Sequence, residues 1–201
     1  MAANQTAPAT RPGRRPARDA LLEAAAKHFY AHGLTGTGID TITAEAGVAK
    51  KSLYNNFASK ADLVTAYLYA RHEEWLGLYR ARLEKTNTAM DRVLAVFDAY
   101  ADHADLAYEN GFRGCGLLNA AAELPAGDPG RAVVRQHKEE VQALLLEHLA
   151  ELLPDSAERA AAMARHLAFL LEGSMVRAGL EGNDNCIRQA RGIAAALIGS
   201  R

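Results

Sequence analysis

The chain has 201 residues, of which 49% are hydrophobic and 6% aromatic, so it is long enough to bury a sizeable core. Its net charge of −1 is unevenly distributed: residues 1–60 carry eight Lys or Arg against four Asp or Glu, whereas residues 61–201 carry 15 against 20. Two cysteines, short apolar runs and the lack of an apolar stretch after the basic start argue against a disulfide framework, a membrane span and a secretory signal. We therefore expect a cytoplasmic protein without a cofactor, whose N-terminal part meets a polyanion.

Residues 1–15 mix Ala, Pro, Gly and Arg and are expected to form a disordered basic arm. A helix should begin near Pro16 and end at Gly33, which suits the position just after a helix. Thr37 with Asp40 resembles a capping box and predicts the start of a second helix. The glycine at position 47 predicts a tight turn, after which a third helix should run over about 49–57.

The rest of the chain predicts further helices. Ser59 and Asp62 form a second capping box, which should open a long helix reaching about residue 84. Apolar stripes follow over 90–104, 117–124, 134–152, 156–180 and 187–198, separated by Gly- or Pro-bearing breaks. Asp128, directly before Pro129, predicts the N-cap of the helix that carries the 134–152 stripe. No run of alternating β-branched and polar residues predicts a strand. The fold class is thus all-α, with a three-helix helix-turn-helix domain over 16–60 and a helical body over 61–201.

The third helix carries the most informative pattern. On a helical wheel, Leu53 and Phe57 point together toward the core, while the outward and flanking positions are polar: Lys50, Lys51, Ser52, Tyr54, Asn55 and Asn56. Lysine neutralises phosphates or approaches guanine, asparagine pairs with adenine, and hydroxyls contact phosphates. This helix therefore has the composition of one that reads the major groove of DNA.

These segments together resemble the N-terminal domain of the tetracycline-repressor (TetR) family of transcription regulators. The resemblance rests on five linked elements within residues 17–64: Phe29-Tyr30-Ala31-His32-Gly33, Thr37-Gly38-Ile39-Asp40-Thr41-Ile42, Ala46-Gly47-Val48, Leu53-Tyr54-Asn55-Asn56-Phe57 and Ser59-Lys60-Ala61-Asp62-Leu63. Phe112-Arg113-Gly114-Cys115, with Asn119 and Glu123, is similar to a stretch found in a subset of these regulators. Two departures stand out: Ala49 replaces a frequent Ser and leaves the third helix a weak N-cap, and Lys51 replaces a frequent Gly.

The resemblance implies a homodimer, a palindromic operator in double-stranded DNA, and a small-molecule effector that relieves repression. The recognition positions carry over to the six residues of the third helix named above, and Thr37 and Lys60 match common phosphate-contact positions. Arg14 and Arg15 are a DNA-following arm or an ordinary solvated tail. The interpreted effector pocket comprises Trp75, Tyr79, Phe97, Tyr100, Phe112, Cys115, Asn119, His137, Met163 and Phe169, and the interpreted dimer interface comprises Leu171, Met175, Ile187, Ala190, Ala194 and Leu197.

Several alternatives stay open at the level of sequence. The helix pair could be purely structural, and the protein could be a ligand-independent activator, a thiol-based redox sensor through Cys115, or an enzyme using Cys115, a histidine and Glu123. A metal site is not expected, because His137 and His148 lie about 16 Å apart along one helix. Sequence alone names neither the effector nor the operator, and does not separate cavity-lining aromatics from plain core.

Overall fold

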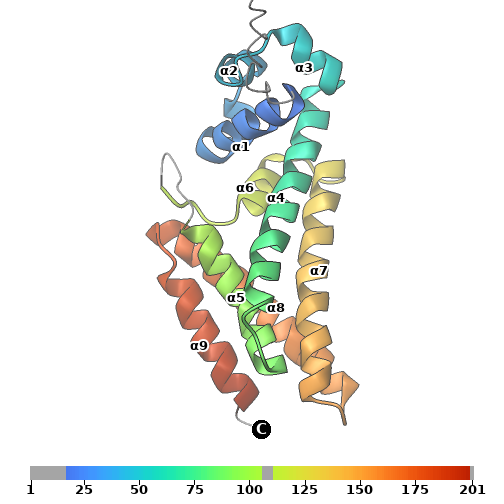
Figure 1. The fold of residues 1–201 in the computed structure, drawn as a ribbon, viewed down its shortest axis with the longest axis vertical. Helices are drawn as coiled ribbons and strands as arrows, with labels where there is room; N and C mark the ends of the chain where they lie inside the picture. Colours follow the sequence, from blue (N-terminus) through green and yellow to red (C-terminus); the bar gives the residue numbers. More distant parts are fainter. Residues whose placement is uncertain (1–16, 106–110, 200–201) are drawn as a thin grey trace, which may run out of the picture.

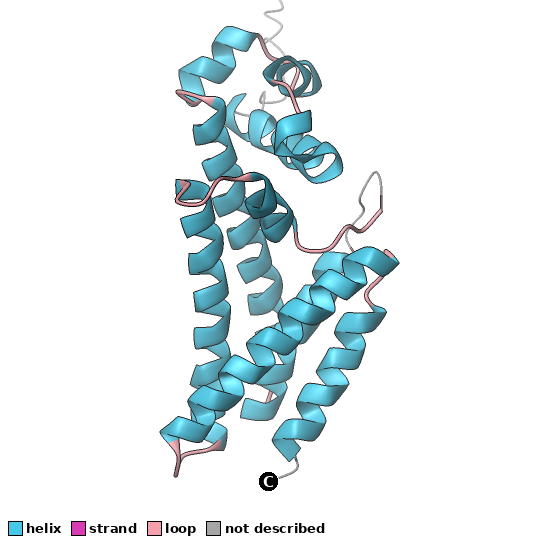
Figure 2. Ribbon diagram, turned by 180° about the vertical axis from the view of Figure 1, so that it is seen from behind, coloured by secondary structure: helices cyan, strands magenta, loops and turns pink. Residues whose placement is uncertain are grey.

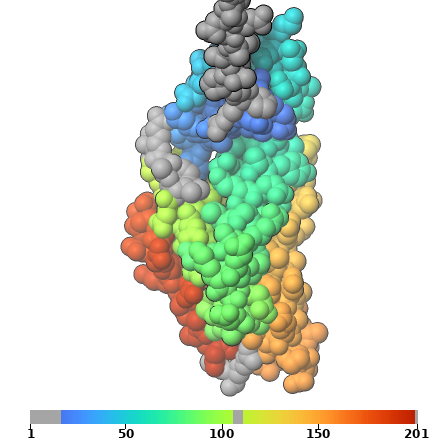
Figure 3. Space-filling model, in the orientation of Figure 1, coloured from blue at the N-terminus to red at the C-terminus, as the bar shows by residue number. Residues whose placement is uncertain are grey.

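The computed structural model describes residues 17–105 and 111–199, and these residues form helices without any strand. The first three helices, which form one end of the elongated molecule in Figures 1 and 3, are α1 (Ala17–Gly36), α2 (Ile39–Glu45) and α3 (Lys50–Asn56). The body contains α4 (Lys60–Leu83), α5 (Ala89–Ala104), α6 (Gly116–Glu123), α7 (Pro129–Leu152), α8 (Ala157–Glu181) and α9 (Asn185–Gly199). The all-α prediction is confirmed, and the predicted helices recur within a few residues of their expected ends.

The three N-terminal helices pack around a small apolar centre. Leu21 and Phe29 from α1, Ile42 from α2 and Leu53 from α3 are all buried there, and Phe57 closes it just after α3. The positive φ of Gly47 makes the turn between α2 and α3. Because α3 buries only the Leu53 side, its remaining faces are left on the surface.

The body is a bundle of long helices in which α4 runs from the N-terminal end alongside α5 and α7 (Figure 1). On the opposite side, α8 packs on α7 and runs diagonally across the front of the bundle beside α9 (Figure 2). Its core includes fully buried Phe97, Leu145, Leu167 and Leu171. Within the described ranges, no helix is long and apolar enough to cross a membrane.

Local capping explains where several helices begin. The Ser59 hydroxyl accepts the backbone N–H of Asp62 at the start of α4, and the Asp128 carboxylate accepts that of Gly130 at the start of α7, as predicted. The predicted Thr37 cap is wrong, since Gly38 is the N-cap of α2 and provides no side-chain bond. Thr37 is instead buried, and its hydroxyl donates to the carbonyls of Gly33 (2.7 Å) and His28 (3.1 Å) at the end of α1.

Candidate nucleic-acid interface and interior cavity

The outer face of α3 is polar, cationic and accessible. Lys51, Tyr54 and Asn55 are exposed, with the Tyr54 ring about half accessible. Lys50 is also exposed, and its Nζ lies 2.8 Å from Oδ1 of Asp40 on α2. The hydrogen bond and the negative charge of Asp40 raise the pKa of Lys50, so this side chain stays cationic. The face therefore offers positive charge and hydroxyl and amide groups to a polyanion.

Two other predicted contacts on α3 are partly engaged within the helix. Asn56 is exposed, but its amide donates to the carbonyl of Ser52 at 2.8 Å. Ser52 itself is half-buried. Lys51, Tyr54 and Asn55 are consequently the members of the predicted set whose polar ends are most accessible.

Two of the predicted phosphate contacts make hydrogen bonds within the fold. The Thr37 hydroxyl is buried among backbone carbonyls and donates to them. The half-buried Lys60 donates from Nζ to the carbonyl of Leu34 at 2.6 Å, which ties the start of α4 to the end of α1. Contact of these two side chains with a phosphate stays a prediction. Arg14 and Arg15 lie outside the described residues.

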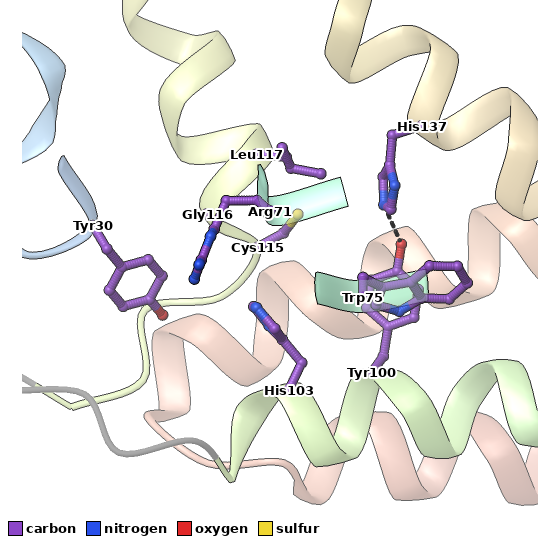
Figure 4. Close-up of a pocket in the computed structure, with 9 residues that line it drawn as sticks. All are labelled: Tyr30, Arg71, Trp75, Tyr100, His103, Cys115, Gly116, Leu117 and His137. Atoms are coloured by element: carbon purple, nitrogen blue, oxygen red, sulfur yellow. Dashed lines mark hydrogen bonds between the residues drawn. The ribbon is translucent and has the colours of Figure 1, made fainter. Parts of the chain in front are cut away.

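An interior cavity lies where α1, α4, α5, α7 and the start of α6 meet (Figure 4). Its walls are Tyr30, Arg71, Trp75, Tyr100, His103, Cys115, Gly116, Leu117 and His137. The room left for the centre of a water molecule is about 20 Å³, although the whole hollow with its mouth encloses about 370 Å³. Since one water needs about 10–15 Å³ by the first measure, a larger ligand must displace part of the wall.

A chain of hydrogen bonds fixes the polar groups along one side of the cavity. His137 pairs through Nε2 with the Tyr100 hydroxyl and through Nδ1 with Nδ1 of His72, both at 3.0 Å. Burial, together with the nearby charges of Lys138, His72 and His103, lowers the pKa of His137 to about 2. Burial and the charges of Arg71 and Lys138 lower the pKa of His103 to about 4. Both imidazoles are therefore neutral at neutral pH.

Lys138 lies behind this wall and joins three groups. Its Nζ is 2.8 Å from Oε1 of Glu172, 3.4 Å from the Tyr100 hydroxyl and 3.7 Å from Sγ of Cys115. Burial opposes the charge, but the nearby Cys115, Tyr100 and Glu172 raise the pKa of Lys138 above its ordinary value. The lysine is thus a buried cation that is paired with a carboxylate and in contact with a thiol.

The structure brings together four of the ten residues interpreted as the effector pocket: Trp75, Tyr100, Cys115 and His137. The other six lie elsewhere. Tyr79 stacks on Trp75 and bonds His148, Phe97 and Phe112 are buried, Met163 is half-buried, Asn119 donates to the Arg113 carbonyl, and Phe169 is 67% exposed. Phe169 therefore lies on the surface of the single chain and does not line this cavity. Sequence reasoning missed Tyr30 and Arg71, because helical periodicity does not reveal which polar side chains turn inward.

The cavity wall is bonded to the turn of α1 that precedes Gly33, where a non-helical backbone (φ 80°, ψ 167°) interrupts the helix. The backbone N–H of Arg113 donates to the Tyr30 hydroxyl at 2.6 Å, and that hydroxyl lies 3.1 Å from the Gly114 carbonyl. The Arg113 guanidinium donates at 2.8 Å to the carbonyls of Tyr30 and Ala31, which a helix end otherwise leaves unpaired. The segment 112–116 therefore holds the DNA-binding part and lines the cavity at once.

Glu123, at the end of α6, makes a second tie to the same place. Its two carboxylate oxygens accept the backbone N–H groups of Leu34 and Thr35, each at 2.8 Å. Partial burial opposes ionisation, but these bonds and the charge of Lys60 lower the pKa of Glu123 below its ordinary value. The recognised stretch singled out Glu123 in the sequence, but nothing there predicted these bonds to α1.

The side of α8 and α9 that faces away from the bundle is apolar. Phe169, Val176 and Leu180 on α8, and Ile193 and Leu197 on α9, are between 44% and 80% exposed. A groove between the two helices runs along this side and includes Phe169, Gly173 and Ile193 in its lining. We call this side the α8/α9 outer face.

Five of the six residues interpreted as the dimer interface are buried within the single chain. Leu171, Met175, Ile187, Ala190 and Ala194 are at most 2% exposed, because they pack α8 and α9 onto their own bundle. Leu197 belongs to the outer face, and Ala190 lines the groove of that face despite its burial. The two apolar sides of α8 were visible in the sequence, but periodicity does not say which one faces the chain's own core.

An N-terminal helix-turn-helix with an exposed cationic face, joined through α4 to a larger helical bundle with a cavity, defines a helical DNA-binding regulator. A profile of the family described as "Bacterial regulatory proteins, tetR family" matches residues 21–67. The fold aligns with a TetR-family transcriptional regulator from Streptomyces coelicolor with a TM-score of 0.81 and 32% identity, over 92% of this chain and 95% of that one. The chain belongs to the TetR family of transcriptional regulators.

Two curated relatives match over a shorter part. The transcriptional activator FasR of Mycolicibacterium smegmatis is 34% identical over 85 residues, which are 42% of this chain and 39% of FasR. The transcriptional repressor KstR2 of Mycobacterium tuberculosis is 34% identical over 82 residues, which are 41% of each chain. This chain thus spans about two fifths of the length of either relative in these alignments.

Proposed function

We propose that this protein is a repressor that binds a palindromic operator as a homodimer and leaves it when a small-molecule effector enters the cavity. The observation that carries the proposal is that the cavity wall and the tie to α1 are the same segment, residues 112–116. A ligand that moves this wall must also move the bonds that hold Tyr30 and Ala31.

In this proposal, α3 is the helix that contacts the major groove and recognises the DNA sequence. Lys51, Tyr54 and Asn55 project from its exposed face, and Lys50 flanks them. Placed in a major groove, the cations and hydroxyls meet phosphates and the amide meets a base edge. Arg14 and Arg15 are proposed to follow the DNA as a basic arm.

Dimerisation is assigned to the α8/α9 outer face. A monomer gains nothing by exposing several large apolar side chains in one patch, and such patches mark interaction sites. A second copy brings an identical face, which suits a two-fold contact between self-complementary surfaces. Two α3 helices about one helical turn of DNA apart are then available to two half-sites.

The switch follows from the size of the cavity. Its room for about one or two waters is too small for an effector, so binding requires an open form of the wall. An effector that binds the open form better shifts the population toward it, by no more than its difference in affinity for the two forms. Loss of the Arg113 and Glu123 ties then lets α1 to α3 move relative to the body.

The test starts from duplexes selected by the protein from a random library. The expected product is an inverted repeat whose half-sites lie about 34–36 Å apart, bound by two chains per duplex in light scattering. Enrichment of no sequence, or of single half-sites bound by one chain, contradicts the proposal. With an operator in hand, fluorescence anisotropy measures release by candidate effectors.

We also propose that the protein acts by binding and not by catalysis. It does so in the cytoplasm, where the DNA lies. The enzyme interpretation needed Glu123 beside Cys115, but both oxygens of Glu123 are occupied by the backbone of Leu34 and Thr35. FasR and KstR2 are described as an activator and a repressor, so a reporter gene behind the selected operator decides the sign of regulation.

A thiol-based redox sensor is a second candidate, favoured by the 3.7 Å contact between Nζ of Lys138 and Sγ of Cys115. Hydrogen peroxide should then release operator from the parent protein and the Cys186→Ser variant, but not from Cys115→Ser. Equal release from all three variants, or from none, removes this candidate.

A further inference from the structure

Two buried hydrogen-bond donors in the cavity wall have no acceptor among the described residues. They are Nε1 of Trp75, a residue that is only 3% exposed, and Nε of Arg71. The two residues are four apart on α4, so they lie on one face of that helix and both line the cavity. Buried donors in proteins are nearly always paired, so these two point to an acceptor that a ligand brings.

The charges around the cavity are already balanced. Arg71 lies 2.7 Å from Oε2 of Glu74 and Lys138 lies 2.8 Å from Oε1 of Glu172. The neutral His103 and His137 add no charge at neutral pH. An anionic ligand would give up its hydration next to the Glu74 carboxylate without meeting an unpaired cation, which is unfavourable. The acceptor that fits is therefore uncharged.

The remaining wall is aromatic. The Trp75 ring lies 5.0 Å from that of Tyr100, tilted by 46°, and 5.4 Å edge-on from that of His137. Figure 4 shows these rings on one side of the cavity, while Arg71, Tyr30 and His103 approach its other side from three different helices. Flat rings next to a narrow space select a flat ligand, since such a ligand needs the least movement of the wall.

We propose that the effector is an uncharged, planar aromatic carbonyl compound, such as an aryl ketone, quinone or lactone, whose oxygen accepts from Trp75 and Arg71. This inference rests on the proposed function, because it names the ligand class of the same cavity. The aromatic part lies against Trp75 and Tyr100, and the carbonyl carries the specificity.

Three probes of the same shape separate the possibilities: 2-acetylnaphthalene, 2-naphthoate and 2-ethylnaphthalene. They share the ring and differ only in offering a neutral acceptor, an anionic acceptor or none. Calorimetry on the full chain should rank the ketone first, about tenfold tighter than 2-ethylnaphthalene, because two net hydrogen bonds are gained. Trp75 is the chain's single tryptophan, so its indole N–H gives one NMR signal, which should move downfield with the ketone alone.

Two variants assign the donors. Trp75→Phe keeps a ring and removes the N–H, and Arg71→Lys keeps the charge and removes Nε. Each should weaken binding of the ketone about fivefold more than it weakens binding of 2-ethylnaphthalene. Arg80→Lys, at an exposed position of the same helix, is the matched control and should bind the ketone like the parent.

The outcomes distinguish failure of the proposed ligand class from failure of the proposed function. Tighter binding of 2-naphthoate, equal binding of the ketone and 2-ethylnaphthalene, or binding of none of the three overturns the ligand class. If the same preparation still binds its selected operator, only the ligand class fails. If it binds no operator, the proposed function fails together with this inference.

Discussion

The outer sides of α3 and of the α8/α9 pair are both exposed helical surfaces, yet their chemistry is opposite. The face of α3 presents Lys51, Tyr54 and Asn55, whereas the α8/α9 outer face presents Phe169, Val176 and Leu180. The first can exchange water for phosphate oxygens and base edges, and the second only for another apolar surface. Exposure alone thus does not identify an interface; the side chains that are exposed determine the kind of partner.

The two surfaces also differ in how firmly the fold holds them. The seven-residue α3 has an Ala49 N-cap without a side-chain bond, whereas the 25-residue α8 has a Ser156 cap and a fully buried inner side. Between them lies segment 112–116, whose Gly114 lies against α8: a Cβ on Gly179 would come 2.7 Å from the Gly114 nitrogen. The short α3 and the long α8 are therefore connected through segment 112–116, by its ties to α1 and its close backbone contact with α8.

The largest expected effect is the loss of dimer in Val176→Glu. A carboxylate at this exposed position is harmless in a monomer but would be buried without a partner charge in the dimer, at a cost of several kcal/mol. Light scattering should show a monomer with unchanged helical circular dichroism. Leu146→Glu on α7, which also replaces an exposed apolar side chain by a carboxylate, is the control and should stay dimeric. A stable Val176→Glu dimer would assign the interface elsewhere.

A wedge between the cavity and α1 should act as a partial effector. A Cβ on Gly116 would lie 3.1 Å from Cδ2 of Tyr30 and 3.2 Å from the Tyr67 hydroxyl, so in Gly116→Ala these side chains must give way by a few tenths of an ångström, and Tyr30 belongs to α1. Accommodating such a group costs about 1–3 kcal/mol. We expect weaker operator binding without any effector, measured by anisotropy.

The control for this wedge is Gly77→Ala on α4, where nothing lies within 4 Å of the added carbon. It should bind operator like the parent and raise the unfolding temperature slightly, because alanine favours a helix interior. If Gly116→Ala and the parent are both folded and bind the operator with equal affinity, the cavity wall does not influence DNA binding by α3.

Removal of one cation from α3 should weaken every duplex to a similar degree. If Lys51 meets a phosphate, Lys51→Ala lowers the slope of log affinity against log salt by roughly 1 per protomer. Lys85→Ala, exposed just after the end of α4, should leave the slope unchanged. A change in which sequence is preferred, with the salt slope retained, would mean that Lys51 reads a base.

The fold followed from the sequence because capping and periodicity are local. Ser59 and Asp128 were predicted as caps and act as caps, since their bonds span only two or three residues. Thr37 was predicted to cap α2 but bonds the end of α1 instead, because a buried hydroxyl beside unpaired helix-end carbonyls satisfies more groups there.

The cavity and the dimer face could be predicted only in part because they depend on how distant helices meet. Trp75 and Tyr100 were expected at the cavity, whereas Arg71 and Tyr30 come from α4 and α1 and carried no local sign of facing it. Likewise, Met175 and Val176 are adjacent in the sequence, but Met175 is buried in the core and Val176 is exposed on the surface. Which side of α8 turned inward was decided by α7 and α9, not by α8 itself.

The smallest expected effect concerns the weak cap of α3. Ala49 has the extended backbone of an N-cap, with φ −69° and ψ 149°, but no side chain to accept a helix N–H. Ala49→Ser supplies that acceptor and should stabilise the chain by about 1 kcal/mol in chemical denaturation. Ser59→Ala is its mirror image, since it removes the bond to the Asp62 N–H and should cost a similar amount.

The same pair of variants tests whether the flexibility of the reader matters for DNA binding. If α3 frays in the free protein, Ala49→Ser also reduces the ordering needed on the operator, so affinity should rise modestly with an unchanged salt slope. Because Ser59 caps α4 rather than the reader, Ser59→Ala should lower stability without this change in affinity. A stabilised Ala49→Ser protein with the parent's operator affinity would mean that α3 is already fully formed before it meets DNA.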